Sequence, residues 1–195
     1  MKRITPPMRF AIMFVCMTIS AVAQTPPASP ILSSKSIYQV DGDWSDDGGK
    51  PFKIESLRGK PVVLVMFFTR CELACPLMLG ELQTLRAALP AGVRDATRFV
   101  LVSMDVARDD ANSLRAYRQR NKLDGENWIL LRGTHESVTD LAMLLGLKFK
   151  QDTRGQFAHS NLITVLNKEG EIVRQRSGVQ EEKAPVIKAV IDAAR

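Results

Sequence analysis

Three apolar runs in the middle of the chain predict the strands of a buried sheet. Val62 to Phe68 is a run of seven apolar residues rich in β-branched and aromatic side chains, which is typical of a strand covered on both faces. Phe99 to Met104 has the same character, and Trp128 to Leu131 predicts a shorter third strand. After the first run the apolar residues recur at helical spacing instead, at Met78, Leu82, Leu85 and Leu89. The pattern therefore alternates strand and helix.

Local start and stop signals bound the predicted helices. Pro90 to Gly92 ends the helix that follows the first strand, and Asp109 and Asp110 open the next one. Thr134 is placed to cap a third helix. The apolar face of that third helix is Val138, Leu141, Ala142 and Leu145.

The sequence at both ends of the folded region predicts shorter secondary-structure elements. Ile37 to Val40 and Phe52 to Ile54 are strand-like segments around a polar, glycine-rich stretch, and together they predict a hairpin ahead of the main sheet. Leu162 to Leu166 and Ile172 to Gln175 flank a four-residue connection that ends in glycine, which predicts a second hairpin. A last helix has Ile187, Val190, Ile191 and Ala194 on its apolar face.

This order of elements predicts an α/β fold. It gives a central, mainly parallel sheet with helices on both faces and a C-terminal antiparallel hairpin, and it matches a thioredoxin-like fold. Ligands of such open sheets collect beyond the carboxyl ends of the strands. We therefore expect the functional residues to follow the strands directly.

The first residues have the features of an export signal. Lys2, Arg3 and Arg9 precede an apolar run that is short for a membrane span, and a small-x-small cleavage signature follows at residues 21–23. We expect residues 1–23 to be a signal peptide, 24–36 a proline- and serine-rich linker, and 37–195 the thioredoxin-like domain. An uncleaved membrane anchor is the first alternative. A lipid-modified Cys16 is less favoured because the bulky Val15 precedes it.

Removing the signal changes the charge and the number of cysteines. The net charge falls from +6 to +3 because the segment carries three cations and no anions. This mild excess contains no basic block, so it does not indicate a nucleic acid as partner. The mature chain keeps Cys71 and Cys75 alone. A disulfide over so short a loop stabilises little, so the pair indicates chemistry rather than a structural link.

Cys71 and Cys75 lie where the first buried strand runs into a helix. Pro76 suits the first turn of that helix, because its fixed φ fits and its missing N–H is not needed there. The positive end of the helix dipole near Cys75 and the guanidinium of Arg70 both favour a thiolate. We expect a reactive pair of sulfurs in an exported protein.

His159 is the candidate third ligand. It comes directly before the first strand of the C-terminal hairpin, where a thioredoxin-like fold brings a loop up to the cysteine turn. Thiol oxidoreductases of this fold carry a cis proline in that loop, but this chain has no proline between Pro90 and Pro185. Two thiolates and one imidazole suit Cu(I). We expect the other histidine, His135, to be solvated.

The chain resembles the Sco/SenC family of thioredoxin-like copper-binding proteins from about Ile37 to Arg195. The motifs that carry the resemblance are Leu57 to Pro61, Cys71-x-x-x-Cys75-Pro76, Val102 to Asp105 with Arg108-Asp109, and His159-Ser160. The cysteine pair with a distant histidine is the specific part, whereas the Gly-Lys-Pro run is common among thioredoxin-like chains. The resemblance implies one copper ion bound by Cys71, Cys75 and His159.

The resemblance also implies a destination for the copper. Family members deliver copper to, or reduce thiols at, the copper centre of cytochrome c oxidase. The partner would then be an oxidase subunit, in the periplasm or at a membrane facing it. This chain has Glu72 and Leu73 where the family usually has proline and often aspartate, and Val106 where it has proline. These changes affect partner choice more than metal binding, so another exported copper protein fits nearly as well.

Three other interpretations remain open. In a thiol-disulfide oxidoreductase Cys71 would attack and Cys75 would resolve, although helix position alone favours Cys75 as the attacker. A peroxidase needs one activated cysteine, for which Thr69 and Arg70 give weak support. The plainest interpretation is a small structural disulfide with His159 in an unrelated role. In the copper interpretation Asp105 is a candidate outer-shell group. That interpretation makes the chain mainly a metallochaperone, and an enzyme only if its thiols catalyse disulfide exchange.

Overall fold

The computed structural model describes residues 32–40, 42–151, 157–159, 161–178 and 182–195. The predicted signal peptide and the first part of the predicted linker lie outside these residues. The described part of the linker, residues 32–36, already contacts the domain, because Ser36 is buried and pairs with Glu171 in an isolated β-bridge. Within the described ranges, none of the helices combines the length and the apolar run that a membrane crossing requires.

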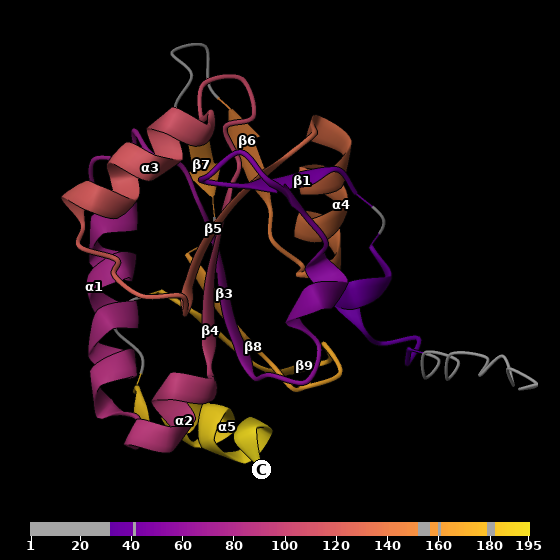
Figure 1. The fold of residues 1–195 in the computed structure, drawn as a ribbon, viewed down its shortest axis with the longest axis vertical. Helices are drawn as coiled ribbons and strands as arrows, with labels where there is room; N and C mark the ends of the chain where they lie inside the picture. The colour runs from indigo at the N-terminus through magenta and orange to yellow at the C-terminus, as the bar shows by residue number, and fades with distance from the viewer. Residues whose placement is uncertain (1–31, 41, 152–156, 160, 179–181) are drawn as a thin grey trace, which may run out of the picture. The chain divides into compact units, whose positions relative to one another are not determined.

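The main sheet has seven strands in the order β2-β1-β5-β4-β3-β8-β9 (Figure 1). Its strands are β1 (Trp44–Asp46), β2 (Pro51–Phe52), β3 (Val62–Phe67), β4 (Arg98–Ser103), β5 (Trp128–Gly133), β8 (Leu162–Leu166) and β9 (Ile172–Ser177). The neighbours β3, β4 and β5 run parallel, and antiparallel pairs extend the sheet on both sides of them. The predicted fold class is confirmed, with parallel pairing confined to the three central strands.

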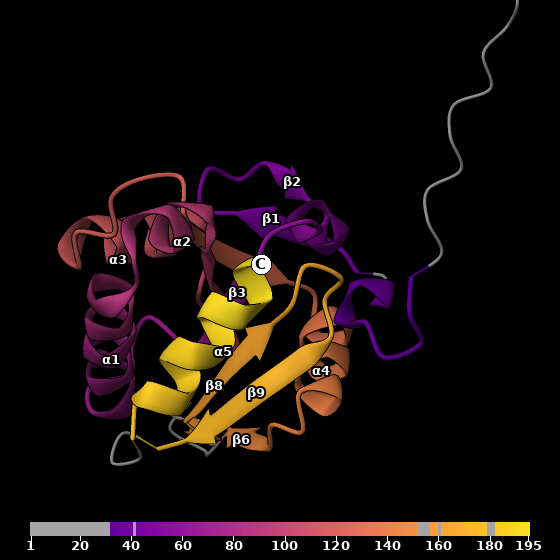
Figure 2. The same cartoon turned by 90° about the horizontal axis from the view of Figure 1, so that it is seen from below.

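Helices cover both faces of this sheet. The α-helices are α1 (Ala74–Ala88), α2 (Ala91–Ala96), α3 (Ala111–Arg120), α4 (His135–Leu144) and α5 (Ala184–Ala194). In the two ribbon views α1 and α3 lie on one side of the sheet and α4 lies on the other (Figures 1 and 2). Every residue of β3 is at most 1% exposed, as expected for a strand between two helical layers.

The predicted capping residues act as expected. Asp110 accepts a hydrogen bond from the backbone N–H of Ser113 at the start of α3, and Thr134 accepts one from Ser137 at the start of α4. Each bond satisfies a backbone donor that has no partner within the helix. The exposed His135 lies in the first turn of α4, where the sequence placed it.

The prediction for the first hairpin was wrong in its details. Ile37–Gln39 forms a short 3-10 helix, η1, rather than a strand, and Ile54–Leu57 forms a second one, η2. The hairpin is built instead from β1 and β2, which pair Trp44 with Phe52. Ser36 caps η1 by accepting from the N–H of Tyr38, which favours the turn over an extended segment.

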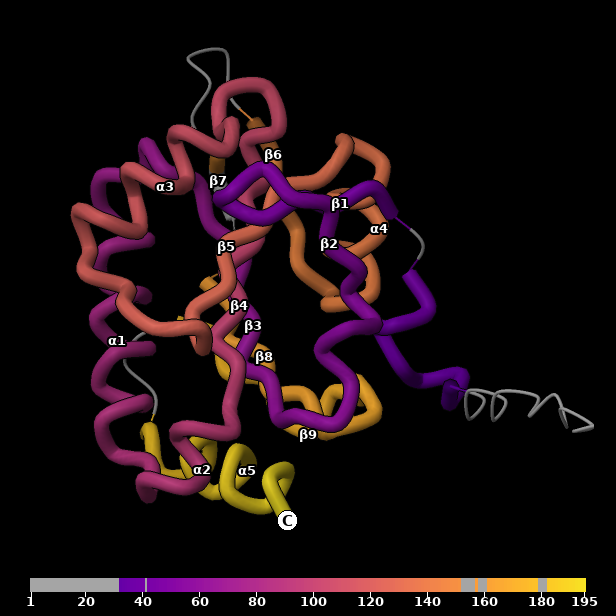
Figure 3. The backbone as a smooth tube through the Cα atoms, in the orientation of Figure 1, coloured from indigo at the N-terminus to yellow at the C-terminus, as the bar shows by residue number. Residues whose placement is uncertain are grey.

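Two further short strands form a separate antiparallel pair. They are β6 (Phe149–Gln151) and β7 (Phe157–His159), and their register places Phe149 opposite His159. In Figures 1 and 3 this pair lies at the same end of the molecule as the beginning of α3. The sequence predicted His159 in a loop, but in the structure His159 is the last residue of β7.

Candidate metal centre

The turn between β3 and α1 carries both cysteines, as the sequence predicted. Phe67 ends β3, and the N–H of Cys71 donates to the carbonyl of Phe68 at 3.2 Å, which closes a tight turn. Helix α1 then begins at Ala74, so Cys75 lies in its first turn. The chain thus leaves the buried strand and presents two sulfur atoms within the seven residues that follow Phe68.

A hydrogen bond joins the two cysteines. The backbone N–H of Cys75 donates to Sγ of Cys71 at 3.2 Å. Both residues are thiols rather than a disulfide. Adjacent sulfur atoms of this kind are soft ligands that suit Cu(I), so the donor chemistry fits the metal that the sequence indicated.

The two cysteines differ in their exposure. Cys71 is half-buried, whereas Cys75 is only 1% exposed. Solvent and partners can therefore reach Cys71 first.

Burial also corrects one prediction about Cys75. The helix N-terminus was expected to favour a thiolate at Cys75, as Arg70 was at Cys71, but desolvation by burial raises the pKa of the Cys75 thiol well above its usual range. The hydrogen bond with Cys71 raises this pKa further, and the backbone of Phe68 lowers it by less. Arg70 is exposed, where solvent weakens its effect. Desolvation dominates because Cys75 points into the core.

The residues between the cysteines face outward. Glu72 is exposed, and Leu73 is 81% exposed at the residue preceding α1. Leu77, one turn further along the helix, is 61% exposed. Any protein that approaches Cys71 meets these side chains.

The structure places the backbone of His159 but not its side chain. The side chain lies outside the described residues, as does Ser160. The neighbouring part of β7 is tied to the cysteine turn, because the rings of Phe157 and Phe68 are 5.2 Å apart between centroids. Phe149 of β6, the strand that pairs with β7, packs on Phe157 with 6.0 Å between the ring centroids. The strand that ends at His159 therefore packs on the residue that begins the cysteine turn.

Among the described side chains, no group of three His, Cys, Asp or Glu residues could hold a metal ion. The described residues supply two of the three predicted ligands, Cys71 and Cys75.

Asp105 lies beyond the end of β4, beside the cysteine turn. It is 1% exposed, and its Oδ2 accepts from Nε of Arg108 at 2.5 Å. Its Oδ1 has no hydrogen-bond partner within the described part of the chain. The sequence named this residue as an outer-shell candidate, and the structure shows it paired with Arg108.

Two residues beside the sulfurs were not predicted from the sequence. The ring of Tyr117 in α3 packs on that of Phe67 with centroids 4.8 Å apart and a tilt of 52°, and burial raises the pKa of Tyr117. Asp109 is fully buried, and its carboxylate holds Thr69, two residues before Cys71. One signal was available: two aspartates precede α3, but a helix has a single N-cap, so the other side chain needs a different partner.

Comparisons with known proteins identify related sequences. The family model described as SCO1/SenC matches residues 35–194. The "Putative copper-binding protein" of Stutzerimonas stutzeri is 31% identical over 65% of this chain and 63% of its own length. The "SCO1 protein homolog" of Bacillus subtilis is 26% identical over 73% of this chain and 76% of its own length. The first match thus covers less than two thirds of that relative.

Solved structures share the fold. A SCO1/SenC family lipoprotein from Bacillus anthracis has a TM-score of 0.70 and 25% identity, over 78% of this chain and 92% of its own. The copper-bound ScoI of Bradyrhizobium japonicum has a TM-score of 0.64 at 20% identity, over 78% of this chain and 94% of its own. Since the family model spans most of the sequence, this chain belongs to the SCO1/SenC family.

Proposed function

We propose that this protein is an exported copper chaperone that binds one copper ion through Cys71, Cys75 and His159. The observation that carries the proposal is a pair of neighbouring thiols beyond the carboxyl end of β3, with Sγ of Cys71 bonded by the backbone N–H of Cys75. Cys71 is half-buried and Cys75 is buried. Two adjacent thiolates bind a soft monovalent ion tightly. The copper-binding names of family relatives support the choice of metal.

The third ligand rests on the position of β7. Its residue Phe157 packs on Phe68, and His159 ends the same strand two residues later. We propose that this strand end brings the imidazole of His159 to the two sulfurs. A single nitrogen donor in addition to two sulfurs gives Cu(I) the low coordination number that it accepts.

The difference between the two cysteines suits a carrier. Cys75 is buried and would keep hold of the ion, while the half-buried Cys71 would exchange with an incoming ligand of the acceptor. Burial raises the pKa of the Cys75 thiol, so copper must displace its proton on binding. Binding should therefore release protons and become tighter as the pH rises.

A competition titration tests the proposed ligands. Reduced protein is titrated with Cu(I) in the presence of a chromophoric chelator, for the wild type and for Cys71→Ser, Cys75→Ser and His159→Ala. We expect the wild type to bind one equivalent of Cu(I) and all three variants to lose affinity. His135→Ala is the matched control, because His135 is exposed on α4 and should not affect binding. Wild-type affinity in His159→Ala would remove His159 from the ligand set.

Delivery to the copper centre of cytochrome c oxidase, or reduction of the thiols there, is the proposed destination. A related structure is described as a member of the Sco family of cytochrome c oxidase assembly proteins. Mixing the copper-loaded protein with the apo oxidase copper domain tests delivery, and mixing the reduced protein with the oxidised domain tests reduction. Transfer in neither mixture would favour another exported copper protein as acceptor.

Export and cleavage are tested on the full chain. The account expects the mature protein in the periplasm to begin after residue 23, with Gln24 as its N-terminal residue. N-terminal sequencing or intact mass measurement of the secreted protein decides this. A full-length mass in the membrane fraction would indicate the uncleaved anchor instead.

A thiol-disulfide oxidoreductase is the second candidate, favoured by the N–H of Cys75 that points at Sγ of Cys71. The Cys71 thiolate would attack a substrate disulfide, form a mixed disulfide and release one substrate thiolate. Cys75 would then lose its proton and attack Cys71, which closes the protein disulfide and releases the second substrate thiolate. A disulfide-reduction assay with a regenerating reductant tests turnover, and Cys75→Ser should trap the mixed disulfide.

A further inference from the structure

The connection between β4 and α3 places a carboxylate under the cysteine turn. Asp109 is 0% exposed, and its Oδ2 accepts from the backbone N–H of Thr69 at 2.9 Å and from the hydroxyl of Ser103 at 2.6 Å. Its Oδ1 accepts from the hydroxyl of Thr69 at 2.6 Å. Three donors thus converge on one buried carboxylate.

Thr69 links this carboxylate to the sulfurs. Its backbone and its side chain are both held, so neither its position nor its rotamer is free. Two residues later the N–H of Cys71 closes the turn on the carbonyl of Phe68. The carboxylate thereby fixes the strand end from which the cysteine turn departs.

The backbone of Asp109 is also held by hydrogen bonds. Its backbone N–H donates to the carbonyl of Asp105 at 2.9 Å, and its own carbonyl accepts from Nε of Arg132 at 3.0 Å. Ser103, which also bonds the carboxylate, is paired with Phe67 in the parallel register of β3 and β4. Asp109 thus joins the cysteine turn to the end of β4 and to Arg132 of β5.

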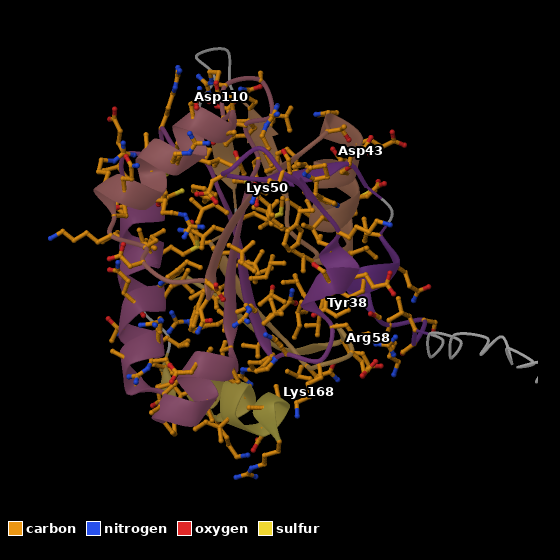
Figure 4. All side chains as sticks on the ribbon, viewed as in Figure 1. Tyr38, Asp43, Lys50, Arg58, Asp110 and Lys168 are labelled. Atoms are coloured by element: carbon orange, nitrogen blue, oxygen red, sulfur yellow. The ribbon has the colours of Figure 1, made fainter. Side chains whose placement is uncertain are left out.

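Helix formation does not explain this burial. Asp110 is the N-cap of α3, and Figure 4 shows it at the end of the molecule where α3 begins. A buried carboxylate is strongly unfavourable unless hydrogen bonds compensate for lost hydration. Hydrogen bonds to a charged acceptor are about twice as strong as neutral ones. An apolar residue at position 109 would avoid the desolvation, but it would leave the turn without its attachment.

We infer that Asp109 is a positioning residue of the metal centre, which acts through Thr69 to hold the turn that carries Cys71 and Cys75 in a geometry suited to binding. This inference rests on the proposed function, because the property that it affects is the affinity of the two sulfurs for copper. Outer residues that orient metal ligands typically change affinity about 10- to 100-fold when they are removed.

The first test measures Cu(I) affinity by chelator competition in Asp109→Asn and Thr69→Val. Asp109→Asn keeps the shape and one acceptor oxygen but removes the charge, and we expect a loss of about 10-fold or more. Thr69→Val removes one hydroxyl of nearly the same volume and should lose less. The double variant should lose no more than Asp109→Asn alone, because both changes break the same attachment.

Two matched variants separate positioning from a general loss of stability. Thr69→Ser keeps the hydroxyl that bonds Asp109 and should restore wild-type affinity. Thr139→Val makes the same change as Thr69→Val at an α4 residue whose hydroxyl bonds the carbonyl of His135. It should bind copper like the wild type. If Asp109→Asn lowers the free energy of unfolding but keeps wild-type affinity, the inference is overturned.

A second readout contains no copper. The protein dithiol is equilibrated with oxidised glutathione, which gives the Cys71–Cys75 disulfide and two molecules of reduced glutathione. A turn held by Asp109 keeps the thiols together, so Asp109→Asn should make the disulfide easier to reduce, by about 30 mV for each tenfold change in the equilibrium constant.

This second readout also distinguishes the two ways of failing. If the wild type takes up no Cu(I), the proposed function fails, and the glutathione equilibrium alone decides whether Asp109 positions the thiols. An unchanged equilibrium in Asp109→Asn together with unchanged copper affinity would show that the carboxylate has no influence on the sulfurs.

Discussion

The two ends of the central sheet handle polar groups in opposite ways. At the carboxyl ends of β3 and β4, Asp105 and Asp109 are almost completely buried beside the cysteine turn. At the other end Arg58 and Glu169 form an ion pair at 2.6 Å, but their side chains remain 20% and 51% exposed. Figure 4 shows Arg58 and the neighbouring Lys168 far from Asp110.

The difference shows where the fold holds side chains rigidly and where it does not need to. An exposed ion pair stays hydrated and contributes little, so it can be replaced easily. Hydrogen bonds offset the desolvation of a buried carboxylate such as Asp109, and they also fix the groups that donate to it. The end with buried charge is the end with the two thiols. Mutations at the two ends should therefore differ in effect.

The largest effect on stability is expected for Asp109→Ala. It leaves the N–H of Thr69 and two hydroxyl groups without their acceptor in the core, and each buried group without a partner destabilises by about 1–3 kcal/mol. We expect the free energy of unfolding to fall by about 3 kcal/mol or more, as measured by urea denaturation. A loss below about 1 kcal/mol would mean that water replaces the carboxylate, and the contrast between the two ends would weaken.

An intermediate effect is expected for Glu81→Gln. Glu81 joins α1 to Arg176 of β9 at 3.1 Å and to Lys183 at 3.2 Å. Burial by itself would raise the pKa of Glu81, but the hydrogen bonds from Arg176 and Lys183 outweigh it and lower the pKa. Arg176 is only 2% exposed. The variant should lose about 2 kcal/mol at neutral pH, the usual scale for hydrogen bonds to charged groups.

The same pair predicts a pH dependence. A carboxylate with a lowered pKa in the folded state stabilises the protein above its unfolded pKa, and this stabilisation disappears as the pH falls through the folded pKa. The difference between the wild type and Glu81→Gln should therefore shrink below about pH 4. Glu126→Gln is the matched control, because Glu126 is exposed and should show no such change. A constant difference down to pH 2 would show that the charge of Glu81 is not involved.

The smallest effect is expected at the opposite end of the sheet. Glu169→Ala removes the partner of Arg58 but leaves the backbone of residue 169, which accepts from the hydroxyl of Ser36. We expect a loss of less than about 1 kcal/mol that disappears at high salt. Urea denaturation at low and at high ionic strength measures both properties. A loss as large as that of Asp109→Ala would contradict the difference between the two ends.

Sequence reasoning worked best where the pattern was long and regular. The seven-residue apolar run fixed β3, and the helical spacing from Met78 to Leu89 fixed α1. The turn between them, with both cysteines, then followed from local signals alone. The strand predicted at Ile37 was wrong because three apolar or aromatic residues fit a 3-10 turn as well as a strand.

The site could be predicted only in part, since its missing features depend on burial. The helix N-terminus and Arg70 are visible in the sequence, but the depth of Cys75 in the core is not, and that depth decides the direction of its pKa shift. Asp109 was visible as a helix start, whereas its bonds to Thr69 join residues 40 positions apart. The imidazole of His159 remains a prediction, because its side chain lies outside the described residues.

The most direct test of the proposed copper site is X-ray absorption at the copper edge of the reduced, Cu(I)-loaded protein. We predict two sulfur scatterers and one imidazole, with the imidazole signal lost in His159→Ala and kept in His135→Ala. A wild-type spectrum with sulfur alone, or an imidazole signal that survives His159→Ala, would contradict the proposal that Cys71, Cys75 and His159 hold the metal together.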